Sequence, residues 1–236
     1  MLNERNCLKV VSCRSASTRL PAKAFLPIGG EPSIIFLLKR LRNLSHLVLA
    51  TSSLPTDDLL TRVVMKQGFI VHRGENENVF ERLRSVAIQS KLPYIVRITG
   101  DCPLVDEELV RITIDKAMEY QSQGIDWDLA STKGQTPPGL DVEIIKVEAM
   151  ERIKSEIDSI EQEHVTLGFL NRPDSFKICK LDIPLFKDFN GSYLLDEFSD
   201  FIFLASEIEE DEKFLRTRDI LEKINNHLDF PKNSAP

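Results

Sequence analysis

Several patterns with well-defined chemistry are missing from this sequence of 236 residues. Its cysteines form no CxxC pair and have no zinc-site spacing, which excludes a disulfide framework and predicts free thiols in a reducing cytoplasm. The glycine-rich motifs GxxxxGK and GxGxxG are absent, which argues against a Walker-type NTPase and a dinucleotide-binding fingerprint. No combination of Ser, His and Asp and no histidine cluster points to a hydrolase. The four cysteines are Cys7, Cys13, Cys102 and Cys179.

Long apolar runs and an excess of positive charge are also lacking. The longest strongly apolar run, Ile34–Leu38, is far too short to cross a bilayer. The polar segment Met1–Lys9 is not followed by the apolar core of a signal peptide. With 30 Lys and Arg against 37 Asp and Glu, the net charge is −7, so there is no broad basic field for nucleic acids or anionic membranes. We therefore expect a cytoplasmic protein with neither of these partners.

The residues that are present suit a globular protein, with 42% hydrophobic and 28% charged side chains. A chain of this length buries a large core, and we expect a single domain over residues 1–236 with its last helices beginning near residue 196. The charge is uneven, because residues 1–42 hold 8 basic and 2 acidic side chains, whereas the remainder holds 22 and 35. A cationic start on an acidic protein indicates one local anion site.

Strand-like and helix-like segments alternate through the first half of the chain. This order predicts an α/β fold with three layers, Rossmann-like, around a mainly parallel central sheet. Pro32 is expected in the first turn of a helix, and Thr56 and Asp106 are expected to cap two others. The predicted strands are Leu8–Ser12, His46–Ala50, Phe69–His72 and Tyr94–Ile98, and the predicted helices are Glu31–Leu44, Asp57–Gln67, Glu77–Lys91 and the segment from Asp106 to Gly124.

Beyond Gly124 the predicted order is mixed. The acidic run Glu207–Glu212 is interpreted as a solvated face between two final helices within Asp196–Asn226. The other predicted elements are strands at Trp127–Ser131, Leu140–Val147 and Phe176–Ile183, and helices at Val147–Ile160 and around Glu161–Leu170.

Polar residues gather where the predicted strands end, which is where open parallel sheets bind ligands. The loop after the first strand places Arg14, Arg19 and Lys23 among three hydroxyl side chains. Guanidinium forks, an ammonium group and hydroxyls suit phosphate oxygens, and three or four such bonds of roughly 1.5–3 kcal/mol each would hold a triphosphate. The alternative interpretation of this loop is a solvated basic surface.

The segment after the fourth strand offers a carboxylate, Asp101, between Gly100 and Pro103. Mg²⁺ is held by one or two carboxylates together with substrate phosphates, so Asp101 opposite the cationic loop suits a metal. The alternative is a turn or helix cap. The segment Asp126-Trp127-Asp128 is similar to the metal-binding DxD of glycosyltransferases, but it begins a strand instead of ending one, so we interpret it as structural.

Several motifs in order along the chain resemble the cytidylyltransferase family, which includes CMP-sialic acid and CMP-Kdo synthetases, and within it the SpsF-like branch of spore coat polysaccharide biosynthesis proteins. The resemblance covers most of the chain. The matching segments are Arg14-x-x-Ser17-Thr18-Arg19-Leu20-Pro21-x-Lys23, Leu49-Ala50-Thr51-Ser52, Arg73-Gly74, Val96–Leu104, Gly139–Glu143 and Glu163–Thr166.

The resemblance implies a glycosyltransferase-A-like nucleotidyltransferase fold, Mg²⁺ as cofactor, CTP and a sugar as substrates, and a homodimer. The implied reaction is attack by a sugar hydroxyl on the α-phosphate of CTP with release of pyrophosphate, which activates an acidic or modified sugar for surface polysaccharide synthesis. By analogy, Arg14, Lys23 and Asp101 are catalytic. The nucleotide-binding set is Arg14, Ser17, Thr18, Arg19, Lys23, Thr51, Ser52, Arg73 and Asp101, the sugar-binding set is Asp141, Glu143 and His164, and the metal ligands are Asp101 and Asp196.

Structural roles stay open for part of this set. His164 is also explained as a core histidine in a helix, and Asp196 as the N-cap of the next helix. Asp141 and Glu143 alternate with apolar residues, as solvent-facing residues of a strand do.

The sequence also departs from the family pattern. Ala16 and Ala22 stand where the family usually has Gly, and Pro138, Gln162 and Phe198 replace other typical residues. These differences leave two alternatives open: a glycosyltransferase that uses a preformed nucleotide sugar, and a non-catalytic homologue that binds a sugar nucleotide.

Overall fold

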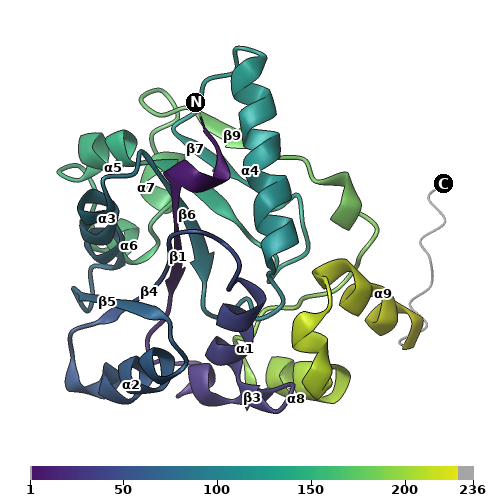
Figure 1. The fold of residues 1–236 in the computed structure, drawn as a ribbon. Coiled ribbons are helices and arrows are strands. Elements are labelled where there is room, and N and C mark those ends of the chain that lie inside the picture. Colours follow the sequence, from purple (N-terminus) through teal and green to yellow (C-terminus); the bar gives the residue numbers. More distant parts are fainter. Residues whose placement is uncertain (1, 228–236) are drawn as a thin grey trace.

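The computed structural model describes residues 2–227 and is built around a central sheet of seven strands in the order β5-β4-β1-β6-β8-β7-β9 (Figure 1). Within this sheet β5, β4, β1 and β6 are parallel, β8 runs antiparallel to both of its neighbours, and β9 is parallel to β7. The strands are β1 (Cys7–Ser12), β4 (Leu47–Ser52), β5 (Ile70–Gly74), β6 (Tyr94–Thr99), β7 (Leu129–Ser131), β8 (Glu143–Lys146) and β9 (Ile178–Lys180), and a separate ribbon joins β2 (Pro27–Ile28) to β3 (Glu31–Pro32).

Helices cover both faces of the sheet (Figure 1). The α-helices are α1 (Ser33–Arg40), α2 (Asp58–Lys66), α3 (Val79–Ser90), α4 (Glu107–Ser122), α5 (Val147–Ile153), α6 (Ser159–Glu163), α7 (Leu167–Leu170), α8 (Phe198–Glu207) and α9 (Thr217–His227). The 3₁₀ helices are η1 (Glu4–Asn6), η2 (Lys23–Phe25), η3 (Pro55–Asp57), η4 (Pro184–Phe186) and η5 (Glu210–Phe214). In the described residues no helix has both the length and the apolar character that a membrane span needs.

The alternation of side chains along the central strands creates two apolar cores. Val10 and Ile95 face the core under α3, α5 and α7. Their neighbours Val11 and Val96 face the other core, under α1, α2, α4 and α9. Because successive side chains of a strand point to opposite faces, continuous apolar strands bury both faces of a sheet. The predicted α/β fold with three layers and a mainly parallel sheet is confirmed.

The chain order predicts a ligand site where β1 and β6 end. From β1 the chain continues to β4 and β5 on one side, and it returns to β6 on the other side of β1. The carboxyl ends of β1 and β6 are in register, with Ser12 beside Thr99, and the amide of Gly100 donates to the carbonyl of Ser12 (2.9 Å). Open α/β sheets bind ligands outside such a reversal of strand order.

Two predicted helix starts were wrong, and one was confirmed. The helix predicted at Glu31–Leu44 begins only at Ser33, because Glu31–Pro32 pairs with β2, so Pro32 precedes the helix. Thr56 is not a cap, because the turn η3 precedes α2 and Asp57 occupies the N-cap position. Asp106 caps α4 as predicted, since its carboxylate accepts the Leu109 amide (2.8 Å).

The second half of the chain is more broken than predicted. The helix predicted at Val147–Ile160 ends at Ile153, and the helical stretch around Glu161–Leu170 divides into α6 and α7 with His164 between them. The final helices α8 and α9 are present, but Glu212 of the acidic run is buried and pairs with Lys223 (2.9 Å) instead of facing solvent. The single-domain prediction also includes residues 228–236, which lie outside the described residues.

Candidate active site

A cavity of about 490 Å³ opens where β1 and β6 end. This volume suits a small organic ligand. Its lining combines five cationic side chains with three carboxylates and one imidazole, carried by the loop after β1, by α3, by β6 and by the segments around His164 and Asp196. The lining residues are Ser12, Cys13, Arg14, Ala16, Ser17, Thr18, Arg19, Lys23, Val79, Arg82, Arg97, Thr99, Gly100, Asp101, Glu163, His164 and Asp196.

Backbone contacts hold the loop after β1 against the cavity. The amide of Ser15 donates to the carboxylate of Asp57 (2.7 Å), and the amide of Ala22 donates back to the carbonyl of Ser15 (3.2 Å). Ala22 has φ +57°, the left-handed region that favours glycine, and it leads directly into η2 at Lys23. This closure directs the predicted phosphate-binding side chains of the loop toward the cavity.

Lys23 bridges two carboxylates from distant parts of the chain. Its Nζ lies 2.9 Å from Oδ2 of Asp101 and 3.1 Å from Oδ1 of Asp196, and Arg19 Nη2 lies 2.8 Å from the other oxygen of Asp196. The structure therefore brings the cationic loop and Asp101 together, as predicted. Burial lowers the pKa of Lys23, but the two carboxylates outweigh it and hold the pKa above its usual value. Burial raises the pKa of Asp101, but Lys23 outweighs it and keeps the pKa below its usual value.

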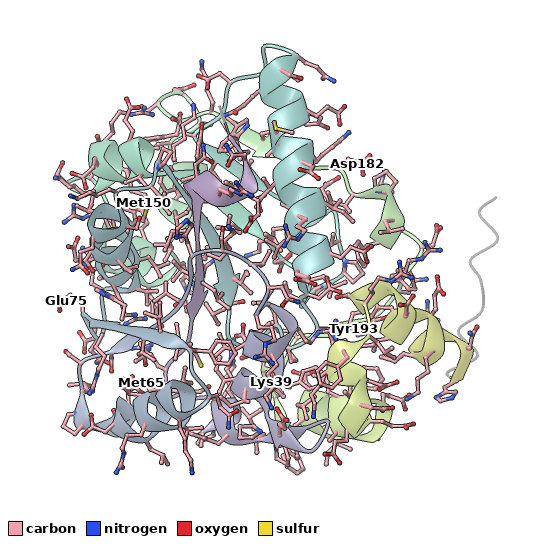
Figure 2. All side chains as sticks on the ribbon, in the orientation of Figure 1. Lys39, Met65, Glu75, Met150, Asp182 and Tyr193 are labelled. Atoms are coloured by element: carbon pink, nitrogen blue, oxygen red, sulfur yellow. The ribbon has the colours of Figure 1, made fainter. Side chains whose placement is uncertain are left out.

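Asp196 reaches the cavity because its segment is fastened to two loops. The amide of Leu195 donates to the carbonyl of Asp101 (2.8 Å), and the amide of Tyr193 donates to the carbonyl of Pro138 (2.8 Å). Tyr193 lies beside the C-terminal helices (Figure 2), 6.4 Å from the ring of Phe203. Gly139 has φ +93°, and a Cβ there would lie 2.3 Å from the backbone of Tyr193, so this crossing requires glycine.

The N-cap role considered for Asp196 was wrong. The residue that occupies the N-cap position of α8 is Glu197, whose side chain forms a capping box with Asp200. The carboxylate of Asp196 instead contacts Arg19 and Lys23.

The pair Asp101 and Asp196 fits a divalent cation. Oxygens of both carboxylates converge on one point, which the Lys23 ammonium occupies. Among residues 2–227 there is no group of three or more His, Cys, Asp or Glu side chains arranged for a metal. Mg²⁺ is typically bound by one or two carboxylates, with phosphate oxygens and water as further ligands, so these two residues suit it. In the other candidate metal motif, Asp126 pairs with Lys146 (2.6 Å) and Asp128 with Arg152 (2.8 Å), in agreement with a structural role.

The predicted sugar-binding residues occupy different environments. Glu143 is 4% exposed, forms an ion pair with Arg97 and accepts the Thr166 hydroxyl (2.9 Å), so a solvent-facing role is wrong for it. Burial, with the nearby charge of Glu143, raises the pKa of Asp141 to about 6. His164 ends α6, is exposed and lines the cavity, so the expectation of a core histidine inside a helix was also wrong. Asp141 and Glu143 lie outside the cavity lining, and Arg97 stands in it.

Three residues predicted near the nucleotide also lie outside the cavity lining. The hydroxyls of Thr51 and Ser52 both donate to the carboxylate of Asp57, and these two side chains are almost fully buried. Arg73 donates to the Ser52 carbonyl (3.0 Å) and pairs with Asp58 (2.7 Å). The same Asp57 that anchors the loop after β1 thus draws Thr51 and Ser52 inward.

Sequence reasoning missed three charged residues of the lining, Arg82, Arg97 and Glu163. For Arg82 a signal existed, because it lies between Val79 and Val86 on the buried stripe of α3. Arginine is almost never fully buried without a partner, so a charge at such a position indicates a specific contact and not a role in solubility. Arg97 and Glu163 carried no signal of burial, and the only pointer to them was their place in the segments Val96–Leu104 and Glu163–Thr166 that match the family.

The cavity cysteine is a packed thiol. Burial raises the pKa of Cys13 to about 12, and burial likewise raises the pKa of Cys102. A thiol nucleophile acts as the thiolate, so neither residue is activated at neutral pH. The chemistry available in the cavity is the alignment of a charged ligand by its cations and carboxylates.

Comparison with known proteins gives concordant results. Residues 8–223 match the protein-family model described as cytidylyltransferase. The chain is 35% identical over 187 residues to the spore coat polysaccharide biosynthesis protein SpsF of Bacillus subtilis, covering 75% of each. It is 29% identical over 113 residues to 3-deoxy-manno-octulosonate cytidylyltransferase of Agrobacterium fabrum, which covers 44% of this chain and 43% of that protein. The structure of a cytidylyltransferase from Leptospira borgpetersenii superposes with a TM-score of 0.86 at 25% identity and covers 98% of both chains.

Proposed function

Because this chain belongs to the cytidylyltransferase family and is a nucleotidyltransferase, we propose that it transfers CMP from CTP to a sugar hydroxyl, releases pyrophosphate and uses Mg²⁺. The observation that carries the proposal is the ammonium of Lys23 between the carboxylates of Asp101 and Asp196 in the cavity lining. In this arrangement the cation proposed to bind phosphate lies beside the two carboxylates proposed to bind the metal, where β1 and β6 end. The similarity to the spore coat polysaccharide biosynthesis protein SpsF supports a role in surface polysaccharide synthesis, and we propose an acceptor sugar that is acidic or otherwise modified.

The proposed reaction forms one bond and breaks one. The acceptor hydroxyl oxygen bonds to the α-phosphorus of CTP, the bridging oxygen leaves with pyrophosphate, and the hydroxyl proton passes to a base at the cavity or to water. In such transfers a protein contributes mainly alignment and charge neutralisation. Arg14, Arg19 and Lys23 balance the negative charge of the triphosphate, with the hydroxyls of Ser17 and Thr18 as additional donors.

Asp101 and Asp196 would hold the metal, and Mg²⁺ bound there supplies positive charge beside the phosphate oxygens. On the acceptor side His164 and Arg97 face the cavity, and Glu143 orients Arg97 through their ion pair. We also propose that Asp141 contributes to the acceptor site.

We further propose a homodimer and a cytoplasmic location. All four cysteines are free and buried, which supports the reducing compartment. Size-exclusion chromatography with light scattering tests the oligomeric state, and a monomer at micromolar concentration would remove the dimer from the proposal.

The exchange Asp101→Asn tests the function. It should lower the rate of pyrophosphate release from CTP at least about 10²-fold, because one charge that acts at the transferring phosphate is lost. The matched control is Asp126→Asn, which removes the first carboxylate of the other metal-like motif. Asp126 pairs with Lys146 and Lys177 away from the cavity, so this variant should keep the wild-type rate.

Calorimetry with CTP and Mg²⁺ decides the proposal more directly. Folded wild-type protein that binds no CTP at millimolar concentration would exclude it. A preference for a nucleoside diphosphate sugar over CTP, without pyrophosphate release across a panel of sugars, would instead indicate a glycosyltransferase.

A further inference from the structure

Arg82 is a buried cation at the cavity, and no carboxylate among residues 2–227 forms an ion pair with it. It is 1% exposed, lines the cavity from α3 and donates from Nη1 to the backbone carbonyls of Glu75 and Asn76. Its Nε has no hydrogen-bond partner within residues 2–227, and none of the carboxylates described there comes within ion-pair distance. The charge of Asp57 acts on Arg82 without an ion-pair contact, and the Asp57 carboxylate is already bonded to Ser52 and the loop after β1. A buried charge without a counter-charge is costly, so this arrangement favours an anion from outside the chain.

Arg14 lies against the same carbonyl. Its Nη1 donates to the oxygen of Asn76 (2.8 Å), which also accepts from Arg82 (3.1 Å). Within the described chain the ion pair found for Arg14 is a long contact of 3.8 Å to Glu163, whose side chain is 59% exposed. Burial and the charge of Arg14 lower the pKa of Arg82 to about 10, so Arg82 is a cation at neutral pH.

The other three cations of the cavity differ from this pair. Arg19 and Lys23 contact the carboxylates of Asp101 and Asp196 at 2.8 to 3.1 Å. Arg97 is paired with the buried carboxylate of Glu143. These three charges are balanced within the chain, whereas those of Arg14 and Arg82 are largely unbalanced. The cavity therefore has two cationic regions, one tied to the metal-binding carboxylates and one open to an anion.

We infer that Arg14 and Arg82 form a phosphate subsite that binds a phosphoryl group of the nucleotide without a metal. The inference rests on the proposed function and adds Arg82 to the groups that bind the substrate. Two adjacent guanidinium groups match the oxygens of a phosphate in geometry and charge. Because Arg82 has no ion pair within residues 2–227 and Arg14 has only the long contact with Glu163, the subsite binds CTP and pyrophosphate alike before a divalent ion arrives.

A purely structural role for Arg82 makes a different prediction. Its bonds to Glu75 and Asn76 also hold the loop after β5, so its removal could lower the melting temperature alone. A phosphate subsite requires that ligand affinity, and with it the ligand-induced rise of the melting temperature, is lost. The two roles are separated by measuring binding and thermal stability on the same variant.

The experiment is calorimetry of CTP and of pyrophosphate in EDTA, with wild type, Arg82→Met and the control Arg84→Met. Arg84 lies on the same helix, and its pairing with Glu81 and Glu151 keeps it outside the cavity. Arg82→Met should lower the affinity for both ligands at least about 10-fold, since a hydrogen bond to a charged group contributes roughly 1.5–3 kcal/mol. Arg84→Met should bind both ligands within twofold of wild type. If Arg82→Met does not fold, Arg82→Lys serves in its place and should weaken both ligands to a smaller extent, because it keeps the charge but loses the fork.

Each other outcome overturns the inference. Unchanged affinity with a lowered melting temperature assigns Arg82 a structural role. Weaker binding of CTP with unchanged binding of pyrophosphate would show that Arg82 contacts the nucleoside. Wild-type protein that binds CTP only when Mg²⁺ is present, or that binds CTP but not pyrophosphate in EDTA, shows that no metal-free phosphate subsite exists. Wild-type protein that binds no CTP with or without Mg²⁺ refutes the proposed function itself.

Discussion

Two acidic residues that are neighbours in one motif, Asp141 and Glu143, differ in how their charge is balanced. Glu143 is the more deeply buried of the two, but it has an ion pair with Arg97 and a hydrogen bond from Thr166. Asp141 has neither a hydrogen bond nor an ion pair to any residue within 2–227, and burial raises its pKa. An ionised group held in such a place destabilises the folded chain, so its retention is consistent with the acceptor-side role proposed for it.

The exchange Asp141→Asn should therefore stabilise the protein at neutral pH. The pKa of Asp141 in the folded protein is about 6, against 3.8 in the unfolded chain, so the folded state binds the proton more tightly. The contribution of the Asp141 carboxyl group to stability is present at low pH and is lost as the pH rises from about 4 to about 6. Relative to wild type, the variant should gain about 1–3 kcal/mol in the free energy of unfolding at pH 7 and almost nothing at pH 4. Urea unfolding at several pH values measures this, and a gain that does not depend on pH would contradict it.

At the scale of the elements, the loop after β1 depends on one residue with an unfavourable backbone. Ala22 adopts φ +57° at the start of η2, the short helix that carries Lys23. A residue with a Cβ costs about 1–2 kcal/mol in this region, and glycine avoids most of that cost. The contacts of Ser15 with Asp57 and Ala22 keep the loop in this shape.

Ala22→Gly should raise the free energy of unfolding by about 0.5–1 kcal/mol, because relief of the left-handed strain exceeds the added entropy of the unfolded chain. Ala16→Gly is the matched control in the same loop. Ala16 is exposed and is not among the residues with positive φ, so that exchange should be neutral or slightly destabilising. Equal effects of the two exchanges in thermal unfolding would show that the backbone of Ala22 is not strained.

Helix boundaries in the second half of the chain show what local patterns miss. The segment predicted as one helix around Glu161–Leu170 breaks at His164, where φ −96° and ψ 66° leave the helical region. The break exposes the imidazole to the cavity while Val165 and Phe169 pack under the sheet. The sequence did not reveal the break, because no glycine or proline marks it between Ser159 and Leu170 except Gly168, which lies beyond it.

On the scale of the whole molecule, the proposed metal and nucleotide sites share the same charges. Without ligands, Asp101 and Asp196 are neutralised by Lys23 and Arg19. A triphosphate that takes over these cations leaves the two carboxylates unbalanced, and a divalent ion restores the balance. By linkage each ligand therefore increases the affinity for the other, and couplings of this kind are typically about 5- to 150-fold.

Asp196→Asn should reveal this coupling. Mg²⁺ should tighten CTP binding to wild type at least about fivefold. The variant should bind CTP more tightly than wild type in EDTA, because Arg19 and Lys23 are less firmly held, and it should gain little from Mg²⁺. Calorimetry with and without the metal measures both effects. Weaker binding by the variant in EDTA would mean that Asp196 does not compete with the nucleotide for these cations.

The sequence by itself determined the parallel sheet, the cationic loop after β1, the carboxylate after β6 and the cap of α4 at Asp106. These features follow from residues close in the chain and from the rule that parallel strands present their carboxyl ends at one edge. How the residues that complete the cavity come together was settled only by tertiary packing. Leu195 bonds to the backbone of Asp101 and delivers Asp196, whereas Asp57 turns the hydroxyls of Thr51 and Ser52 inward. Which charges neutralise one another depends on distances between segments far apart in the sequence, and these distances exist only once the layers have packed.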